Sequence, residues 1–319
     1  MKLNVPANFS FRSTVNSHGW YLLAPFRWSP REKVLRRAEV VGGKAVDLTM
    51  SFSDGRTSPS APRGVEPRVP RGGADEDVRP SIVVSGVRDS AELRAKLTRM
   101  FQLHVDTSGF VTLTRNSPSH EWVARSGFGR LLCGSTLFED IVKIIATTNT
   151  TWQQTVRMTE LLVEKCGKRT RTKRAAFPEP ADILQFREDE LQQDCRLGYR
   201  AKSIHSLASG IVNGSIDLAR ISDASQKTEE LFASYKTLPG IGPYGAAHLL
   251  AMDGRHDFIA VDSEFRRFVR ERYHKGRAVS DIAMLRRYAK WGRWKYLAYW
   301  AELWSSVADR LQPADSEGK

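Results

Sequence analysis

Leu-Pro-Gly-Ile-Gly-Pro-Tyr-Gly-Ala-Ala, residues 238–247, is the stretch that decides the fold of this chain. Gly240 and Gly242 allow a turn that is too tight for side chains, so that its main-chain N–H groups can approach a ligand. Apolar residues at helical spacing precede the turn, and Pro243 suits the first position of a second helix. The stretch therefore predicts two helices joined by a glycine hairpin, within residues 228–253.

A hairpin of this kind creates an anion site, because unpaired N–H groups and a helix N-terminus point to the same side. Twenty residues after Gly242 comes Asp262, directly before a helical run at residues 263–273. Aspartate is a favoured N-cap residue, so Asp262 could simply cap that run. Beside a phosphate-binding hairpin, a lone carboxylate is also a candidate for catalysis.

The hairpin resembles the helix-hairpin-helix DNA-binding motif, and with Asp262 it resembles the HhH-GPD superfamily of DNA glycosylases. In that superfamily a catalytic aspartate follows the hairpin at this distance. Residues 285–296 look like the 3-methyladenine (alkylpurine) class, and residues 101–106 look like the N-terminal domain of alkylpurine and 8-oxoguanine DNA glycosylases. The resemblance implies a partner, double-stranded DNA with a damaged base, and a reaction in which the flipped base is cut from its sugar with the help of Asp262.

The resemblance also assigns the residues that hold DNA. Asn149 is the candidate for the space that the flipped base leaves, although an Asn at this turn could equally end a helix. The superfamily often binds Na⁺ or K⁺ at the hairpin through main-chain carbonyls, here those of Lys236, Leu238 and Ile241, and it needs no cofactor for catalysis. The expected DNA contacts are Gly240, Gly242, Pro243, Gly245, Asn149 and Arg266.

Candidates for the wall of a base pocket are Tyr244, His248, Trp294 and Trp20. Aromatic residues are more often core than pocket, and a lone histidine is more often a packed helix residue. Tyr244 also bears on the mechanism. Bifunctional members of the superfamily place a Schiff-base lysine at this position, and tyrosine has no amine. The sequence therefore predicts a monofunctional enzyme without a lyase step.

Composition limits the classes of protein to consider. The chain has 319 residues, 41% of them hydrophobic, and a net charge of +13, which alone would fit nucleic acid, an anionic membrane or an acidic partner. Its three widely spaced cysteines favour reduced thiols and no iron–sulfur cluster. Without a membrane-length apolar run or a signal-peptide pattern, we expect no membrane partner and a monomer that is cytoplasmic (nucleoid-associated) or nuclear, not secreted.

The chain order predicts an α+β N-terminal domain at residues 1–130 and an all-α domain at 131–312. The first should be an antiparallel sheet with one or two helices, similar to the TBP-like domain, interrupted by a disordered insertion at 53–80. Residues 313–319 should be a flexible tail. Strands are expected at 9–15, 20–23, 38–41, 45–48 and 81–84, and helices at 91–103, 136–147, 151–167, 181–194, 200–213, 281–291 and 293–311.

Three other functions remain open from the sequence. The same architecture also serves a glycosylase for oxidised purines. A non-catalytic, structure-specific DNA-binding protein would use the hairpin only to hold phosphate, although the position of Asp262 argues against it. An RNA-binding basic protein would need an aromatic recognition signature that this sequence lacks.

Overall fold

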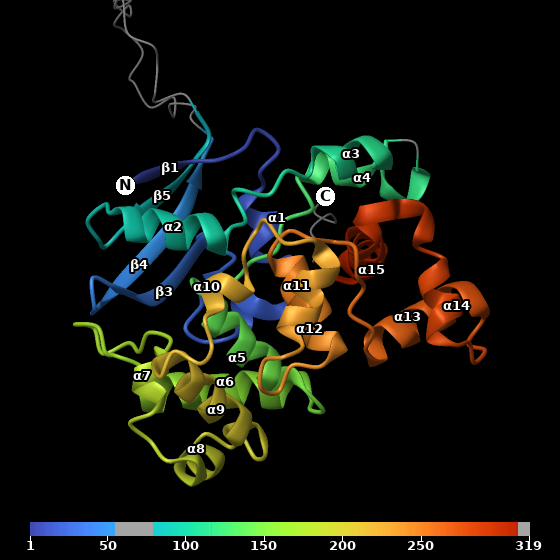
Figure 1. The fold of residues 1–319 in the computed structure, drawn as a ribbon. Helices are drawn as coiled ribbons and strands as arrows, with labels where there is room; N and C mark the ends of the chain where they lie inside the picture. The colour runs from blue at the N-terminus through green and yellow to red at the C-terminus, as the bar shows by residue number, and fades with distance from the viewer. Residues whose placement is uncertain (55–78, 116, 312–319) are drawn as a thin grey trace, which may run out of the picture.

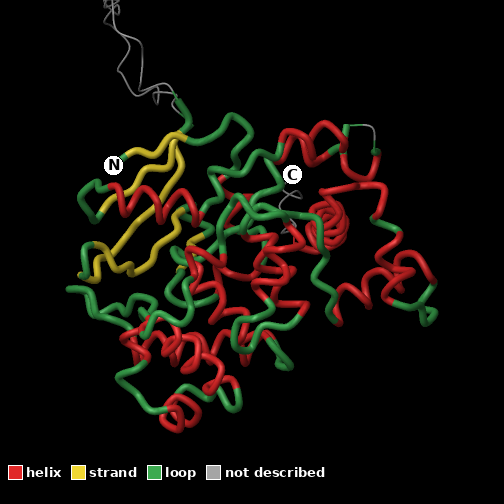
Figure 2. Tube along the Cα trace, viewed as in Figure 1, coloured by secondary structure: helices red, strands yellow, loops and turns green. Residues whose placement is uncertain are grey.

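The computed structural model describes residues 1–54, 79–115 and 117–311. It combines an antiparallel sheet, built from the N-terminal part of the chain, with a larger body of helices, so the α+β class is confirmed (Figures 1 and 2). Most of the predicted insertion at 53–80 and the whole predicted tail at 313–319 lie outside the described residues.

The sheet has five strands in the order β1-β5-β4-β3-β2, and every neighbouring pair is antiparallel. Val41 pairs with Lys44 around a turn at Gly42-Gly43, between two of the expected strands. The helix α2 (Ala91–Met100) crosses one face of the sheet (Figure 1). The strands are β1 (Lys2–Asn4), β2 (Arg27–Ser29), β3 (Val34–Val41), β4 (Lys44–Ser53) and β5 (Ser81–Ser85).

Two predicted strands were wrong. Residues 9–15 alternate in polarity, yet the helix α1 (Phe11–Val15) forms there, because the Ser10 side chain accepts a hydrogen bond from the Ser13 N–H and caps it. Phe11, Thr14 and Val15 then share one buried face. The apolar run that begins at Trp20 forms the 3₁₀ turn η1 (Gly19–Leu22). Both segments are too short for periodicity to separate strand from helix.

The helical body contains the predicted helices in order, with a short helix at 218–221 added and two helices changed. The described part of residues 1–130 holds four α-helices, more than the one or two that were expected, because short helices form at 108–114 and 122–126. The expected helix at 181–194 is two short helices, and the expected helix at 281–291 ends early and continues as a 3₁₀ segment in which Gly292 has a positive φ of 54°. The elements are α3 (Ser108–Thr114), η3 (Pro118–His120), α4 (Trp122–Ser126), α5 (Leu137–Thr147), α6 (Trp152–Cys166), α7 (Pro180–Ile183), α8 (Glu188–Asp194), α9 (Arg200–Val212), α10 (Leu218–Ile221), α11 (Thr228–Tyr235), α12 (Pro243–Met252), α13 (Ser263–His274), α14 (Asp281–Arg286), η4 (Ala289–Trp294) and α15 (Lys295–Leu311).

Two large hydrophobic clusters form the interior. The first joins the inner side of the sheet and α2 to α5, α6, α9, α11 and α12. The second joins α3 and α4 to α13 and α15, and these four helices lie on the right side of the view in Figure 1. Leu131 belongs to the second cluster and Leu132 to the first. The chain therefore crosses from one cluster to the other next to the domain boundary that the sequence predicted at residue 130. The boundary itself stays a prediction.

A buried group of charges joins the sheet to α5. The Arg37 guanidinium of β3 lies 2.9 Å from the carboxylate of Glu139, and the Lys143 ammonium donates to the same carboxylate at 2.7 Å. All three side chains are buried. Burial disfavours the charged form of Glu139, but the two cations outweigh it and lower its pKa to about 2. Removing Glu139 would leave the buried Lys143 ammonium without its ion-pair partner, which typically costs about 3–5 kcal/mol.

Candidate active site

The predicted glycine hairpin is present between α11 and α12, with Pro243 as the first residue of α12. Gly240 has a positive φ of 76°, and a Cβ there would lie 2.8 Å from the Ser203 Cβ, so this position requires glycine. Gly242 has an ordinary φ of −95°, and a Cβ there would meet nothing within 4 Å. The hairpin is therefore packed on its Gly240 side and open on its Gly242 side.

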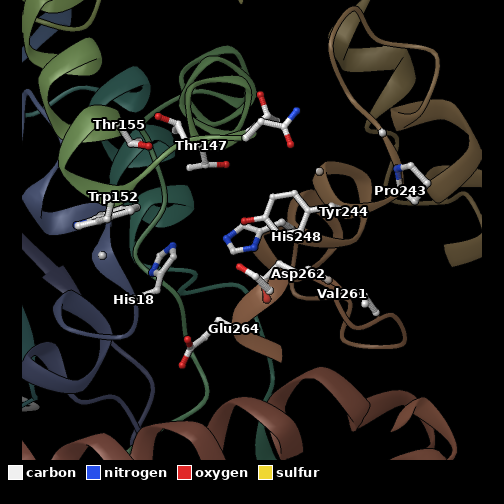
Figure 3. A pocket seen from close by; sticks show the side chains of 18 of the residues that line it. His18, Thr147, Trp152, Thr155, Pro243, Tyr244, His248, Val261, Asp262 and Glu264 are labelled. Carbon is white, nitrogen blue, oxygen red and sulfur yellow. The ribbon is translucent and has the colours of Figure 1, made fainter. Parts of the chain in front are cut away.

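A cavity of about 920 Å³ opens beside the hairpin. Its walls come from the N-terminal segment 18–20, the turn between α5 and α6, α12, residues 260–266 and α15. Figure 3 shows Tyr244, His248 and Asp262 together on one wall, with His18 and Trp152 across from them. Segments that are more than 200 residues apart in sequence thus meet at one site.

Asp262 is both a helix cap and part of the cavity wall. Its Oδ1 accepts a hydrogen bond of 2.7 Å from the Phe265 N–H, which caps α13. The half-buried carboxylate lines the cavity below Tyr244 and His248 (Figure 3). Burial raises the pKa of Asp262, against the opposing effect of the Phe265 hydrogen bond. The two roles that the sequence left open are therefore compatible in one side chain.

Aromatic rings and histidines form the rest of the wall. The Tyr244 and His248 rings lie one helical turn apart on α12, with centroids 5.9 Å apart. Burial and the nearby Asp262 raise the pKa of Tyr244 to about 12, and burial lowers the pKa of His248 to about 4. Trp20 stacks on His248 from the N-terminal segment at 5.4 Å. At neutral pH these rings are therefore uncharged, and the charged side chains that line the cavity are Asp262, Glu264 and Arg266.

Most of the residues that were predicted for the site do meet at the cavity. Trp294 does not. It is buried in the second hydrophobic cluster, where its ring stacks on His256 at 5.8 Å and packs against Phe110. The residues that line the cavity as a group are Trp20, Asn149, Gly240, Gly242, Pro243, Tyr244, Gly245, His248, Asp262 and Arg266.

Two of these side chains are already engaged. The Arg266 guanidinium forms a bidentate pair with Asp281, with both distances 2.9 Å. Asn149 occupies the turn after α5 with a positive φ of 47°, a conformation that Asn tolerates better than most residues. Its amide donates to the Tyr199 hydroxyl at 3.2 Å, and Tyr199 is 60% exposed. Asn149, which lines the cavity, is thus paired with an exposed aromatic side chain.

Several residues of the wall were missed by sequence reasoning. His18 and Trp152 were not candidates, and Tyr296 and Trp300 were not singled out among the aromatic residues of 293–311. The Trp300 indole donates to the Ser17 carbonyl at 2.7 Å, which ties α15 to the N-terminal segment. No local pattern marks such a contact, because its two residues are 283 positions apart.

The structure also describes the atoms that were expected to hold a cation. The Leu238 carbonyl accepts a hydrogen bond from the Ile241 N–H at 3.1 Å, and a carbonyl oxygen has a second lone pair for a cation. In the described parts of the chain, no group of three His, Cys, Asp or Glu side chains is arranged for a metal, and no helix is long and apolar enough to cross a membrane. Cys133, Cys166 and Cys195 are buried free thiols.

Comparisons with known proteins agree with this architecture. The family of HhH-GPD superfamily base excision DNA repair proteins matches residues 142–293. The fold is similar to that of the 3-methyladenine DNA-glycosylase from Archaeoglobus fulgidus, with a TM-score of 0.71 and 19% identity over 97% of this chain and 99% of that chain. It is also similar to MBOgg1, solved with a low-affinity DNA ligand, with a TM-score of 0.69 and 18% identity over 96% of each chain.

A third structure has the same fold. It is the 8-oxoguanine glycosylase/lyase from Clostridium acetobutylicum, solved with double-stranded DNA that contains cytosine opposite 8-oxoG. The TM-score is 0.67, with 17% identity over 95% of this chain and 93% of that chain. A search of curated proteins found no significant match. The match to the family of HhH-GPD superfamily base excision DNA repair proteins thus covers residues 142–293, just under half of this chain, and the likeness in fold covers nearly its whole length.

Proposed function

We propose that this protein is a monofunctional DNA glycosylase that flips an alkylated purine out of duplex DNA and hydrolyses its N-glycosidic bond. The observation that carries the proposal is the carboxylate of Asp262, which lines an aromatic cavity directly beside the glycine hairpin. An enzyme that acts on a base within a duplex must first move that base into such a pocket. The hairpin would hold the backbone through its N–H groups while the base enters.

Asp262 would act on the sugar. Cleavage of an N-glycosidic bond builds positive charge on the deoxyribose, as in other oxocarbenium-like reactions. A fixed carboxylate at the cavity wall can stabilise that charge and can orient or deprotonate the attacking water. The Phe265 N–H holds one Asp262 oxygen in place at 2.7 Å, so the group is oriented before the substrate arrives.

The cavity suits a cationic base. The rings of Trp20, Tyr244 and Trp300 line it, and an aromatic face attracts a cation at short range. Because burial lowers the pKa of both His18 and His248, these histidines stay neutral and do not repel a positive purine. An alkylated purine carries that charge before the bond breaks, so it leaves with little help from a general acid.

The absence of a suitable amine supports hydrolysis without a lyase step. Tyr244 occupies the α12 position that bifunctional relatives give to lysine, and in the described residues no lysine lines the cavity. A Schiff base with the sugar needs a neutral amine within reach of the sugar carbon. The product would then be an intact abasic site.

The proposed activity also implies a binding partner, a cellular location and a bound cation. The net charge of +13 favours duplex DNA, to which the protein would bind as a monomer in a nucleoid-associated or nuclear setting. The carbonyls of Lys236, Leu238 and Ile241, at the end of α11 and in the hairpin, would hold a monovalent cation that stiffens the turn. Such an ion would lend positive charge near the DNA backbone and would take no part in bond cleavage.

Chromatography of released bases tests the proposal. We expect the parent protein to release 7-methylguanine or 3-methyladenine from methylated DNA, and Asp262→Asn to do so about 100-fold or more slowly. Borohydride should not trap the parent on DNA, because no imine forms. Equal rates for Asp262→Asn would remove its catalytic role, and trapping would remove the monofunctional one. Release of 8-oxoguanine alone would favour an oxidised-purine enzyme, and binding without any release would favour a DNA-binding protein.

A further inference from the structure

Two buried histidines lie side by side in the cavity wall. His18 precedes η1 and is 6% exposed, and His248 lies on α12 and is 7% exposed. Their ring centroids are 5.8 Å apart, and Trp20 packs against both rings, at 4.7 Å from His18 and 5.4 Å from His248. Figure 3 shows the two imidazoles as neighbours, with Asp262 close to His248.

Each of these histidines has an unsatisfied ring nitrogen. The Nε2 atoms of His18 and His248 are buried and have no hydrogen-bond partner within the described structure. A buried polar atom without a partner costs about 1–3 kcal/mol, so two in the same wall call for an explanation. Both residues line the cavity, which makes a bound molecule the natural partner.

The hydrogen bonds around Ser17 determine which nitrogen of His18 carries the proton. The Ser17 hydroxyl oxygen accepts from the Leu132 N–H at 3.0 Å and lies 3.0 Å from the His18 Nδ1. We assign the hydroxyl proton to the bond with Nδ1, because the described structure gives the Ser17 hydroxyl no other acceptor, and this places the hydrogen of the neutral ring on Nε2. Burial and the neighbouring His248 lower the pKa of His18, which keeps the ring neutral. His18, a residue of the cavity wall, therefore carries a buried N–H that has no acceptor within the described structure.

Trp20 fixes the geometry of this donor. Its indole N–H donates to the buried Asp140 carboxylate at 3.0 Å, and the same oxygen accepts from the Gly134 N–H at 2.7 Å. The His18 ring stacks on Trp20 with an interplanar angle of only 18°. The donor is thus held against a rigid surface before any base enters.

We propose that His18 and His248 form the edge of the site that recognises the extruded purine. His18 donates its Nε2–H to an acceptor of the base, a carbonyl oxygen or an unsubstituted ring nitrogen, and the His248 Nε2 makes the second contact. The inference rests on the proposed function and deepens it. The two histidines determine specificity and are not catalytic, since Asp262 acts on the sugar.

Binding to two duplexes tests the inference without turnover. In an Asp262→Asn background, affinity is measured for a duplex with one 7-methylguanine and for the same duplex with a tetrahydrofuran abasic analogue, which has no base to read. We expect His18→Phe, which keeps a ring against Trp20, to weaken binding of the 7-methylguanine duplex about tenfold, the effect of one lost hydrogen bond of about 1.4 kcal/mol. Binding of the abasic duplex should not change.

His18→Gln is the matched control, because its amide places a donor near the position of Nε2. It should recover most of the lost affinity, and His248→Phe should act in the same direction as His18→Phe. Equal losses on both duplexes would show a structural role, and no loss on the 7-methylguanine duplex would show that the base is not read; either result overturns the inference.

Base release by the parent protein keeps the two proposals separate. If the parent releases no base while His18 still discriminates between the duplexes, the glycosylase proposal fails and recognition by His18 stands. If the parent releases the base and His18→Phe binds both duplexes as the background does, the opposite holds.

Discussion

Asp262 combines a structural and a chemical task in one side chain, and substitution can separate them. Asn is as good an N-cap as Asp, so Asp262→Asn should keep the hydrogen bond to the Phe265 N–H and the thermal stability of the parent. Asp262→Ala should lose the cap as well, at about 1 kcal/mol of unfolding free energy. Thermal denaturation of both variants, beside single-turnover base release, measures the two roles independently.

Both variants should lose base release to a similar extent, because neither has a carboxylate. A fall in the stability of Asp262→Asn equal to that of Asp262→Ala would mean that the negative charge, and not the cap, stabilises α13. An alanine variant as stable as the parent would mean that the cap contributes nothing.

The residues that sequence reasoning could find are those that neighbour each other along the chain. Asp262 and Tyr244 follow from their distances to the hairpin glycines, and the structure places both at the cavity. His18 was missed because its partners, His248 and the α15 residue Trp300 by way of Ser17, come from the other end of the chain. Trp294 is the opposite case. It is close in sequence to Tyr296 and Trp300, which line the cavity, but its own side chain is buried in the second hydrophobic cluster.

The hairpin between α11 and α12 contains two glycines that differ in backbone conformation and in the space around them. Gly240→Ala forces a Cβ to 2.8 Å from Ser203 at a positive φ of 76°, and we expect it to destabilise the protein by about 1–3 kcal/mol. Gly242→Ala has an ordinary φ and open space, so its unfolding free energy should stay close to that of the parent. Denaturant unfolding compares the two.

DNA binding should respond at Gly242 as well. Its alanine methyl would extend from the open side of the hairpin, where a phosphate is expected to approach the N–H groups. We therefore expect Gly242→Ala to weaken duplex binding about tenfold at unchanged stability, which a fluorescence anisotropy titration can measure. Undiminished binding by a stable Gly242→Ala protein would place the DNA elsewhere.

Elements differed in how well the sequence specified them. The starts of α5 and α6 agree with the helices expected from residues 136 and 151, and Thr136 and Thr151 each cap their helix by accepting a hydrogen bond from the N–H three residues later. The segments at α1 and η1 are only a few residues long. Their conformation is decided by packing against the sheet and α5, which no local pattern contains.

For the molecule as a whole, buried histidines should make stability depend on pH. Burial lowers the pKa of His248 to about 4 and that of His256 to about 3, from an ordinary value of 6.5. The unfolded chain then binds protons that the folded chain excludes. Stability should be fully present above about pH 6.5 and should fall as the pH drops toward 4, by up to about 1.4 kcal/mol per pH unit for each histidine.

His256→Phe provides the control for this dependence. His256 lies between the rings of Trp294 and Tyr296, and both of its ring nitrogens lack a partner within the described structure. Phenylalanine should fit the same stack without a proton to exclude, so the loss of stability between pH 7 and pH 5 should shrink by about 2 kcal/mol. The expectation fails if parent and variant lose equal stability over that range in urea unfolding.

The ion group of Arg37, Glu139 and Lys143 has a consequence for anyone who wishes to shorten this protein. Trimming the chain to the portion that carries the hairpin would remove Arg37, and Glu139 and Lys143 of α5 would then lack the third member of their buried group. It would also remove the N-terminal wall of the base site. The sheet is thus a required half of the enzyme that we propose: it cannot be discarded as an appendage, and repair of DNA by the helical part alone should not survive its removal.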